Sequence, residues 1–174
     1  MEPFIIAENE IDIDINELYS YIDDTEFNND IKKGIKGMLE IVVSRGDSDI
    51  NLDFEDVKTI LAHGNDAFVG SAEYEGKDAA KKAIELAIKN TSLDINSVNK
   101  VAGFLVHFTI HPDMPMLELA DAMEILYENS DNKPDIIWGT TTNKSLNQNY
   151  IKVTILFTGF GKCDIKNIPA NNID

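Results

Sequence analysis

The sequence predicts an α/β fold, a two-layer sandwich in which helices pack on a four-stranded mixed sheet and a long helix comes before the sheet. Segments rich in β-branched and aromatic residues alternate with segments whose apolar residues recur every three or four positions. After two helices, the order is strand, helix, strand, helix, strand, strand. The 174 residues, 43% of them apolar, are enough for one domain with a hydrophobic core.

The composition excludes several classes of partner. The formal charge is −16, from 31 acidic and 15 basic side chains, whereas nucleic acids and anionic membranes attract basic surfaces. Cys163 is the only cysteine, so no internal disulfide can form. The N-terminus lacks a positive leader, and no apolar run approaches the roughly 18 residues of a membrane span. We therefore expect a cytoplasmic protein that binds neither nucleic acid nor membrane.

The first 25 residues form an acidic segment whose structure the sequence leaves open. Ile11, Ile13 and Ile15 alternate with aspartates, as in a short strand. The letters NELYSYI, at 16–22, could equally form a helical turn. Both interpretations stay open.

Residues 27–45 are predicted to form the long helix. Gly34 and Gly37 each cost roughly 1 kcal/mol relative to alanine inside a helix, so we expect another backbone to approach closely there. One side of this helix is basic and the other is apolar. We expect the basic side to be exposed, and it carries Lys32, Lys33 and Lys36. The apolar stripe should pack on the domain or on the N-terminal segment, and it comprises Ile31, Ile35, Met38 and Val42.

The most informative stretch is DINLDFEDVKTIL, at 49–61, where an acidic loop runs into an amphipathic helix. Asp53 stands just before the apolar pattern, so its carboxylate can accept hydrogen bonds from the free amides of the first turn. Asp56 falls in that turn. The simplest interpretation is a pair of acidic residues that cap the helix and suit its positive end.

The remaining elements complete the predicted sheet. Strands are expected at 67–74, 98–110, 135–141 and 150–158, and helices at 77–90 and 116–129. The turn at 143–149 should join the last two strands in an antiparallel hairpin. The inward side of the last helix should carry Leu117, Ala120, Met123, Ile125 and Leu126.

Other candidate sites fail on chemistry. A calcium loop from Asp47 would need glycine at its sixth position and glutamate at its twelfth, where Leu52 and Lys58 stand. His107 and His111 lie about 13 Å apart at strand rise, too far to share a metal, so we expect both to be structural. The glycines near position 159 lack the pattern of a phosphate loop, and Cys163 has no evident histidine partner.

Several motifs resemble the C-terminal half of FtsZ, the bacterial tubulin homologue that polymerises at the division site. N-L-D-F-E-D-V at 51–57 is similar to the synergy loop of that family, and G-I-K-G at 34–37 to its long central helix. Further likenesses are V-G-S-A-E-Y-E-G-K-D-A-A at 69–80, G-F-L-V-H-F-T-I at 103–110, I-I-W-G-T-T at 136–141 and I-K-V-T-I-L-F-T-G-F at 151–160. The likeness covers residues 26–161, which form the expected domain and leave 162–174 as a short tail.

Two features of a complete FtsZ are missing from the sequence. No glycine-rich phosphate loop like G-G-G-T-G-T-G occurs, and no long linker with a basic partner-binding tail follows Gly161. The resemblance thus implies a protein that does not bind GTP alone and lacks a cofactor or metal site of its own.

The resemblance also implies a role for the loop. Asp53 and Asp56 would activate water in trans, with Asn51 and Phe54 as positioning and interface residues on the nucleotide face of a neighbouring subunit. That subunit, FtsZ or another family member including a second copy, would hold GTP and Mg²⁺, at the division site. The loop would then cap filaments or stimulate GTP hydrolysis. The alternatives are a non-catalytic module with the same fold, or the C-terminal domain of a longer polymerising GTPase.

Overall fold

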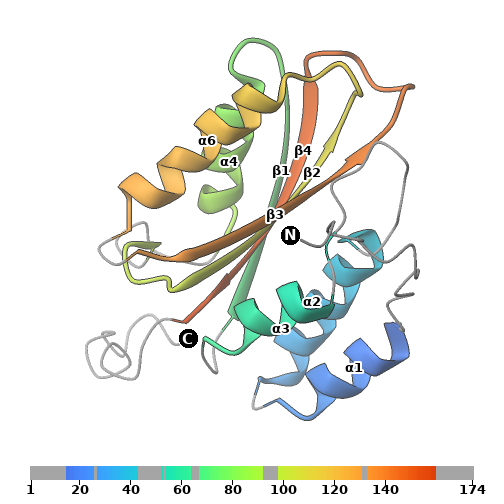
Figure 1. Ribbon diagram of the computed structural model, residues 1–174, viewed down its shortest axis with the longest axis vertical. Helices are drawn as coiled ribbons and strands as arrows, with labels where there is room; N and C mark the ends of the chain where they lie inside the picture. The colour runs from blue at the N-terminus through green and yellow to red at the C-terminus, as the bar shows by residue number, and fades with distance from the viewer. Residues whose placement is uncertain are drawn as a thin grey trace, which may run out of the picture.

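The computed structural model describes residues 15–25, 27–42, 52, 54–63, 67–91, 98–130 and 133–159. Three helices come first, and strands and helices then alternate (Figure 1). The helices are α1 (Ile15–Asp23), α2 (Asn29–Val42), α3 (Phe54–Leu61), α4 (Ala79–Lys89) and α6 (Met116–Glu128). The strands are β1 (Ala67–Glu75), β2 (Gly103–Ile110), β3 (Asp135–Thr142) and β4 (Tyr150–Thr158). From α2 on, the predicted order of elements is confirmed, as is the mixed four-stranded sheet.

The strand order is β1-β4-β2-β3, so the predicted hairpin of the last two strands is wrong. β4 is antiparallel to β1 on one side and to β2 on the other, whereas β3 runs parallel to β2 at the edge. Burial explains this order. Nearly all of β2 and β4 is buried, while β3 is mostly half-buried. A strand whose successive side chains are buried must be covered on both faces, and the centre of the sheet, where β4 lies, is where helices cover both faces.

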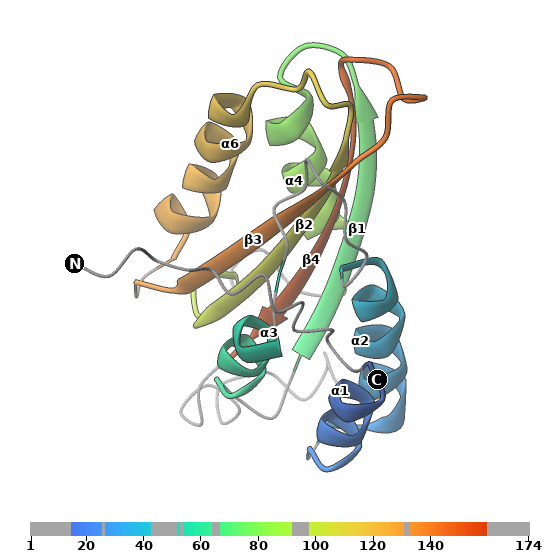
Figure 2. The same cartoon turned by 45° about the vertical axis from the view of Figure 1, so that its right-hand side comes forward.

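Helices cover both faces of the sheet. α4 and α6 lie on one face, and α1, α2 and α3 gather on the other, towards one end (Figures 1 and 2). The first face holds the larger apolar cluster, which includes Phe104, Phe108 and Phe157. The second cluster joins Leu105 and Leu156 of the sheet to the three N-terminal helices. No helix among the described residues is long and apolar enough to cross a membrane.

The first described residues form a helix, so the helical interpretation of 16–22 is confirmed. Ile11 and Ile13 lie outside the described residues. Leu18 and Ile22 of α1 are fully buried in the second cluster, beside Ile35 of α2. α1 is therefore part of the packed structure.

The prediction that the lysine side of α2 is exposed is confirmed only in part. Lys33 is exposed, but Lys32 and Lys36 are half-buried against α1. Lys36 Nζ lies 2.6 Å from Asp23 Oδ1, and Lys32 Nζ donates to the Asp23 carbonyl at 2.8 Å. The carboxylate and carbonyl of Asp23 hold these two ammonium groups against the end of α1, at the edge of the second cluster.

The opposite stripe of α2 packs as predicted where it can be seen. Ile35 and Met38 are buried and Ile31 is half-buried in the second cluster. The side chain of Val42 lies outside the described residues. α2 begins at Asn29 because the preceding Asn28 caps it, its side-chain oxygen accepting from the Ile31 amide at 3.0 Å.

Among the described residues, no backbone approaches the two helix glycines, so the expectation fails for this part of the chain. A methyl group at Gly34 would meet only a Val69 methyl, 3.9 Å away, and one at Gly37 would meet no atom of a described residue within 4 Å. Within the described structure, these glycines lower helix propensity without making room for a neighbour.

Two boundaries were also predicted incorrectly. The strand expected from 98 begins at Gly103, because the Val101 amide bonds back to the Val98 carbonyl in a turn. In α6, Met123 and Leu126 face inward as predicted, but Leu117 and Ala120 are exposed and Ile125 is half-buried. The buried stripe is Leu119, Ala122, Met123 and Leu126. Their i, i+3, i+4, i+7 spacing fits one helix face better than the predicted set does.

Candidate functional site at helix α3

Helix α3 has one buried side and one accessible side. Val57 and Ile60 are fully buried and Leu61 is nearly so, all in the second cluster. Leu52, just before the helix, is buried with them. These anchors fix which side of α3 faces outward. Glu55 of the first turn is exposed on that side, and Asp56 lies half-exposed at its edge.

The structure places part of the predicted site at the edge of this outer side. Asp56 lies half-exposed in the first turn of α3, and Phe54 is its first residue. The side chain of Phe54 lies outside the described residues, as do Asn51 and Asp53. The juxtaposition of Asp53 and Asp56 therefore stays a prediction, and the described site consists of Asp56 and the helix that carries it.

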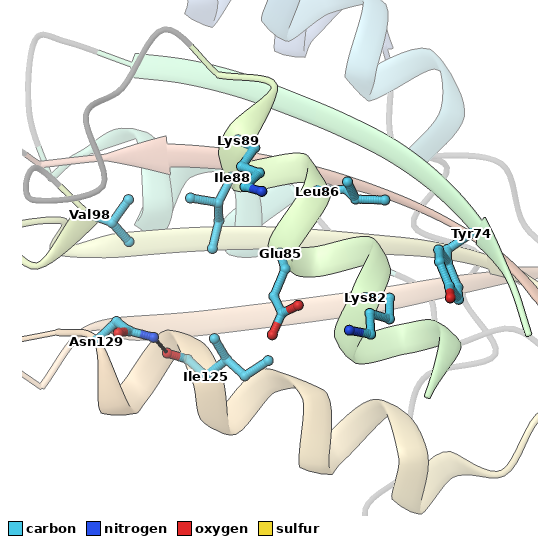
Figure 3. A pocket seen from close by; sticks show the side chains of 9 residues that line it. All are labelled: Tyr74, Lys82, Glu85, Leu86, Ile88, Lys89, Val98, Ile125 and Asn129. Carbon is cyan, nitrogen blue, oxygen red and sulfur yellow. Dashed lines mark hydrogen bonds between the residues drawn. The ribbon is translucent and has the colours of Figure 1, made fainter. Parts of the chain in front are cut away.

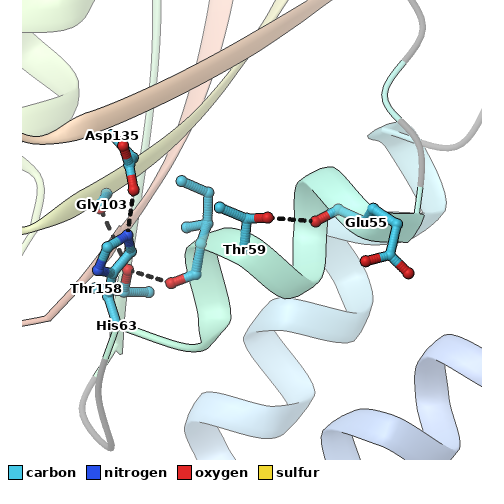
Figure 4. A network of polar contacts seen from close by, with 7 residues as sticks. Glu55, Thr59, His63, Gly103, Asp135 and Thr158 are labelled. Carbon is cyan, nitrogen blue, oxygen red and sulfur yellow. Dashed lines mark hydrogen bonds and ion pairs between the residues drawn. The ribbon is translucent and has the colours of Figure 1, made fainter.

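Polar contacts attach the far end of α3 to the sheet (Figure 4). The buried Thr158 hydroxyl of β4 donates to the Ile60 carbonyl at 2.7 Å. His63, just after the helix, places Nε2 2.7 Å from Oδ2 of Asp135, the first residue of β3. We call these two contacts the α3 anchor. The Ile60 carbonyl, which also accepts from the His63 amide at 3.3 Å, gains a second donor from the sheet.

Two glycines make room for the α3 anchor. A methyl group at Gly103 would come within 2.8 Å of both His63 Cδ2 and Thr158 Oγ1. Gly159 has φ +77°, a conformation that favours glycine, and a methyl group there would lie 2.8 Å from His63 Cβ. The end of α3 can pack against the sheet because Gly103 and Gly159 have no side chains.

The outer side of α3 also contacts α1. Lys58 Nζ lies 3.7 Å from Glu55 Oε1 and 5.6 Å from the centre of the Tyr21 ring. The Thr59 hydroxyl donates to the Glu55 carbonyl at 2.8 Å, one helical turn earlier. The acidic first turn thus has one lysine beside it, and its outer surface continues onto α1.

No motif in the sequence points to the α3 anchor. His63 follows the expected helix, and Asp135 and Thr158 stand at the ends of two expected strands. His63 and Asp135 are 72 positions apart, and no local pattern links them. The packing of α3 across the ends of β2, β3 and β4 brings them together.

The other two histidines are structural, as predicted. Buried His107 places Nε2 2.9 Å from the Thr141 hydroxyl, and His111 Nδ1 accepts from the Asp113 amide at 3.0 Å. Within the described parts of the chain, no group of three or more histidine, cysteine or acidic side chains could hold a metal ion. Cys163 and the acidic loop from Asp47 lie outside those parts.

The fold is an α/β domain of the kind found in FtsZ and CetZ proteins. A solved structure of the FtsZ W319Y mutant from M. jannaschii is 28% identical, with a TM-score of 0.60 over 74% of this chain and 38% of that one. CetZ2 from Haloferax volcanii shares the fold at 20% identity, with a TM-score of 0.52 over 76% of this chain and 40% of that one.

The sequence comparisons identify the family. The family model described as "FtsZ family, C-terminal domain" matches residues 65–161. The cell division protein FtsZ of Wolbachia pipientis is 33% identical over 80% of this chain and 44% of its own length. That of Rickettsia bellii is 34% identical over 88% of this chain and 33% of its own length. The chain belongs to the FtsZ family, and it spans less than half the length of these curated relatives.

Proposed function

We propose that this domain presents helix α3 and the preceding loop to the nucleotide face of a neighbouring FtsZ-family subunit, and stimulates GTP hydrolysis there. Asp53 and Asp56 orient the attacking water, while Asn51 and Phe54 contact the neighbour. The neighbour supplies the bound GTP and Mg²⁺. We place this function in the cytoplasm at the division site, and the relatives are named as cell division proteins.

One observation carries this proposal, namely the orientation of α3. Val57 and Ile60 are fully buried, and the half-exposed Asp56 lies at the edge of that buried side, one turn before Ile60, while the α3 anchor fixes the end of the helix. A catalytic carboxylate must be held close to its productive position, because small displacements cost large factors in rate. A short helix attached along one side and at one end meets this requirement.

The chemistry explains why a partner is needed. Phosphoryl transfer to water requires an in-line nucleophile, a metal ion and positive or dipolar groups around the phosphates. Carboxylates can orient and polarise the water, but they repel phosphate groups. The half-site proposed here therefore acts only when a neighbour supplies the nucleotide and the metal.

The experiment mixes the purified chain with FtsZ from the same organism and measures both GTP turnover and binding. We expect the wild-type chain to raise turnover. The D53N/D56N variant should still bind but lose at least about 10-fold of the stimulation, since general bases contribute about 10²–10⁴-fold. E55Q is the matched control, because Glu55 is an exposed acid in the same turn without a proposed role.

The outcomes separate three functions. If D53N/D56N and wild type stimulate equally, the two aspartates only cap the helix. That variant should change stability by no more than about 1 kcal/mol, because asparagine caps about as well as aspartate. Binding that blocks polymerisation without raising turnover would indicate a filament cap. Absence of binding by the wild-type chain would overturn the proposal.

A further inference from the structure

The outer face of the α4/α6 layer is unusually apolar for a surface. Four large apolar side chains are exposed among the described residues, and all four belong to these two helices. They are Leu86 (37% exposed), Met116 (41%), Leu117 (71%) and Tyr127 (51%). Scattered exposed apolar residues are ordinary, but their concentration on one layer is typical of an interaction surface.

A hollow of ≈ 540 Å³ adds to this surface (Figure 3). Its apolar lining comes from both helices, from β1 and from the turn before β2, and comprises Tyr74, Leu86, Ile88, Val98 and Ile125. Lys82 and Lys89 stand at its margin on α4. The hollow gives a partner's apolar side chains a place to insert between charged groups.

The two helices carry opposite charges. α4 contains three lysines and one glutamate, a net charge of +2, within a chain of net charge −16. α6 contains four acidic residues and no basic one, a net charge of −4. Lys82 and Lys89 are exposed, and neither forms an ion pair with another described residue. The face is thus half basic and half acidic.

The charged residues of α4 and α6 also lie at matching positions along the helix axes. Lys81 and Asp121 line one hollow, and Lys89 and Asn129 line the other, so α4 and α6 run side by side in register. Lys82 and Lys89 are seven residues apart, as are the exposed Asp121 and Glu128. At 1.5 Å rise per residue, each pair spans about 10.5 Å.

We infer that this face binds a second copy of the chain in a twofold dimer. The twofold axis runs parallel to the two helices and midway between them, and it places α4 of each copy against α6 of the other. Each residue keeps its position along the helix direction. Lys82 then meets Asp121 of the second copy, and Lys89 meets Glu128. Because the interface is isologous, each pair occurs twice. Leu86 and Tyr127 lie between the charges and provide apolar contact.

The dimer is weak and independent of α3. The layer is about 20 Å long at 1.5 Å per residue. Two helices of this length bury an area at the small end of specific interfaces. α3 lies on the opposite face of the sheet (Figure 2), so both copies keep it accessible. Failure of the dimer would leave the proposed function of α3 untouched, and the reverse also holds.

Charge reversal tests the dimer by sedimentation velocity over micromolar to hundred-micromolar concentrations. The wild-type chain should approach twice its monomer mass. K82E/K89E alone and D121K/E128K alone should each raise the dissociation constant by at least about tenfold, because like charges then face each other. The quadruple variant, or an equal mixture of the two double variants, should dimerise again, because opposite charges are restored.

The control is K133E/K144E, which reverses two lysines that are exposed outside this layer and should leave the dimer intact. Thermal unfolding of every variant checks that the fold is kept. A wild-type chain that stays monomeric would overturn the inference and assign the face to a different partner or to none. A dimer that resists both double reversals, or that the quadruple variant does not restore, would also overturn it.

Discussion

Gly103 determines how closely the end of α3 can approach the sheet. The His63 ring and the Thr158 hydroxyl both occupy the space where a side chain would stand, within 2.8 Å of an added methyl group. His63 meets Asp135 and Thr158 meets the Ile60 carbonyl across this same position. The smallest residue is therefore required where the α3 anchor crosses β2.

Replacing Gly103 by alanine should destabilise the chain by about 1–3 kcal/mol, because an inserted methyl group forces its neighbours to shift. Urea denaturation measures the change. In the H63A background, Gly103→Ala should cost less stability than it does in the wild-type chain. The His63 ring, one of the two groups that an added methyl group would meet, is then absent. If the cost is the same in both backgrounds, the strain lies with Thr158, and His63 does not limit the approach of α3.

The helix pair α1/α2 shows how an element can fold against its own propensity. Two glycines lie inside α2, yet its stripe through Ile35 and Met38 is buried and α1 covers it with Leu18 and Ile22. Tertiary burial supplies more stability than the glycines cost. α1 also covers part of the basic side, where Asp23 binds Lys32 and Lys36.

Gly37→Ala should raise the free energy of unfolding by about 0.5–1 kcal/mol, because alanine favours the helix and the added methyl group meets no described residue within 4 Å. Chemical denaturation monitored by circular dichroism measures this. Gly103→Ala is the control, because it makes the same substitution where the space is occupied and should lower the stability. A loss of stability in G37A would show that the site is more crowded than the structure has it.

At the scale of the whole molecule, charge and sequence both disfavour nucleotide binding. The chain carries a formal charge of −16, which repels phosphates, and contains no glycine-rich phosphate loop. Within the described residues, the acids of α3 and α6 contribute to this negative surface. The proposed GTPase half-site depends on nucleotide that another subunit holds.

We therefore expect the purified 174-residue chain not to bind GTP. Calorimetric titration with GTP and Mg²⁺ should give no saturable heat, whereas an FtsZ with the phosphate loop, in the same buffer, should bind. Saturable binding at micromolar nucleotide would contradict the division of the site between two subunits.

The sequence by itself determined the type and order of the elements, because apolar periodicity and capping are local. The stripe of α2, the four strands and the place of Asp56 in the first turn of α3 follow from spacing along the chain. The family resemblance also needed only sequence, and the family comparison confirmed it. The catalytic role of Asp53 and Asp56 stays a prediction.

Only the tertiary structure decided which distant segments meet. β4 lies between β1 and β2 instead of pairing with β3, because both faces of the most apolar strands must be covered. His63 reaches Asp135, and Asp23 reaches Lys36, across gaps of 72 and 13 positions. The outward Leu117 depends on which side of α6 meets the sheet. Such contacts are set by the burial of the whole chain, which no local pattern encodes.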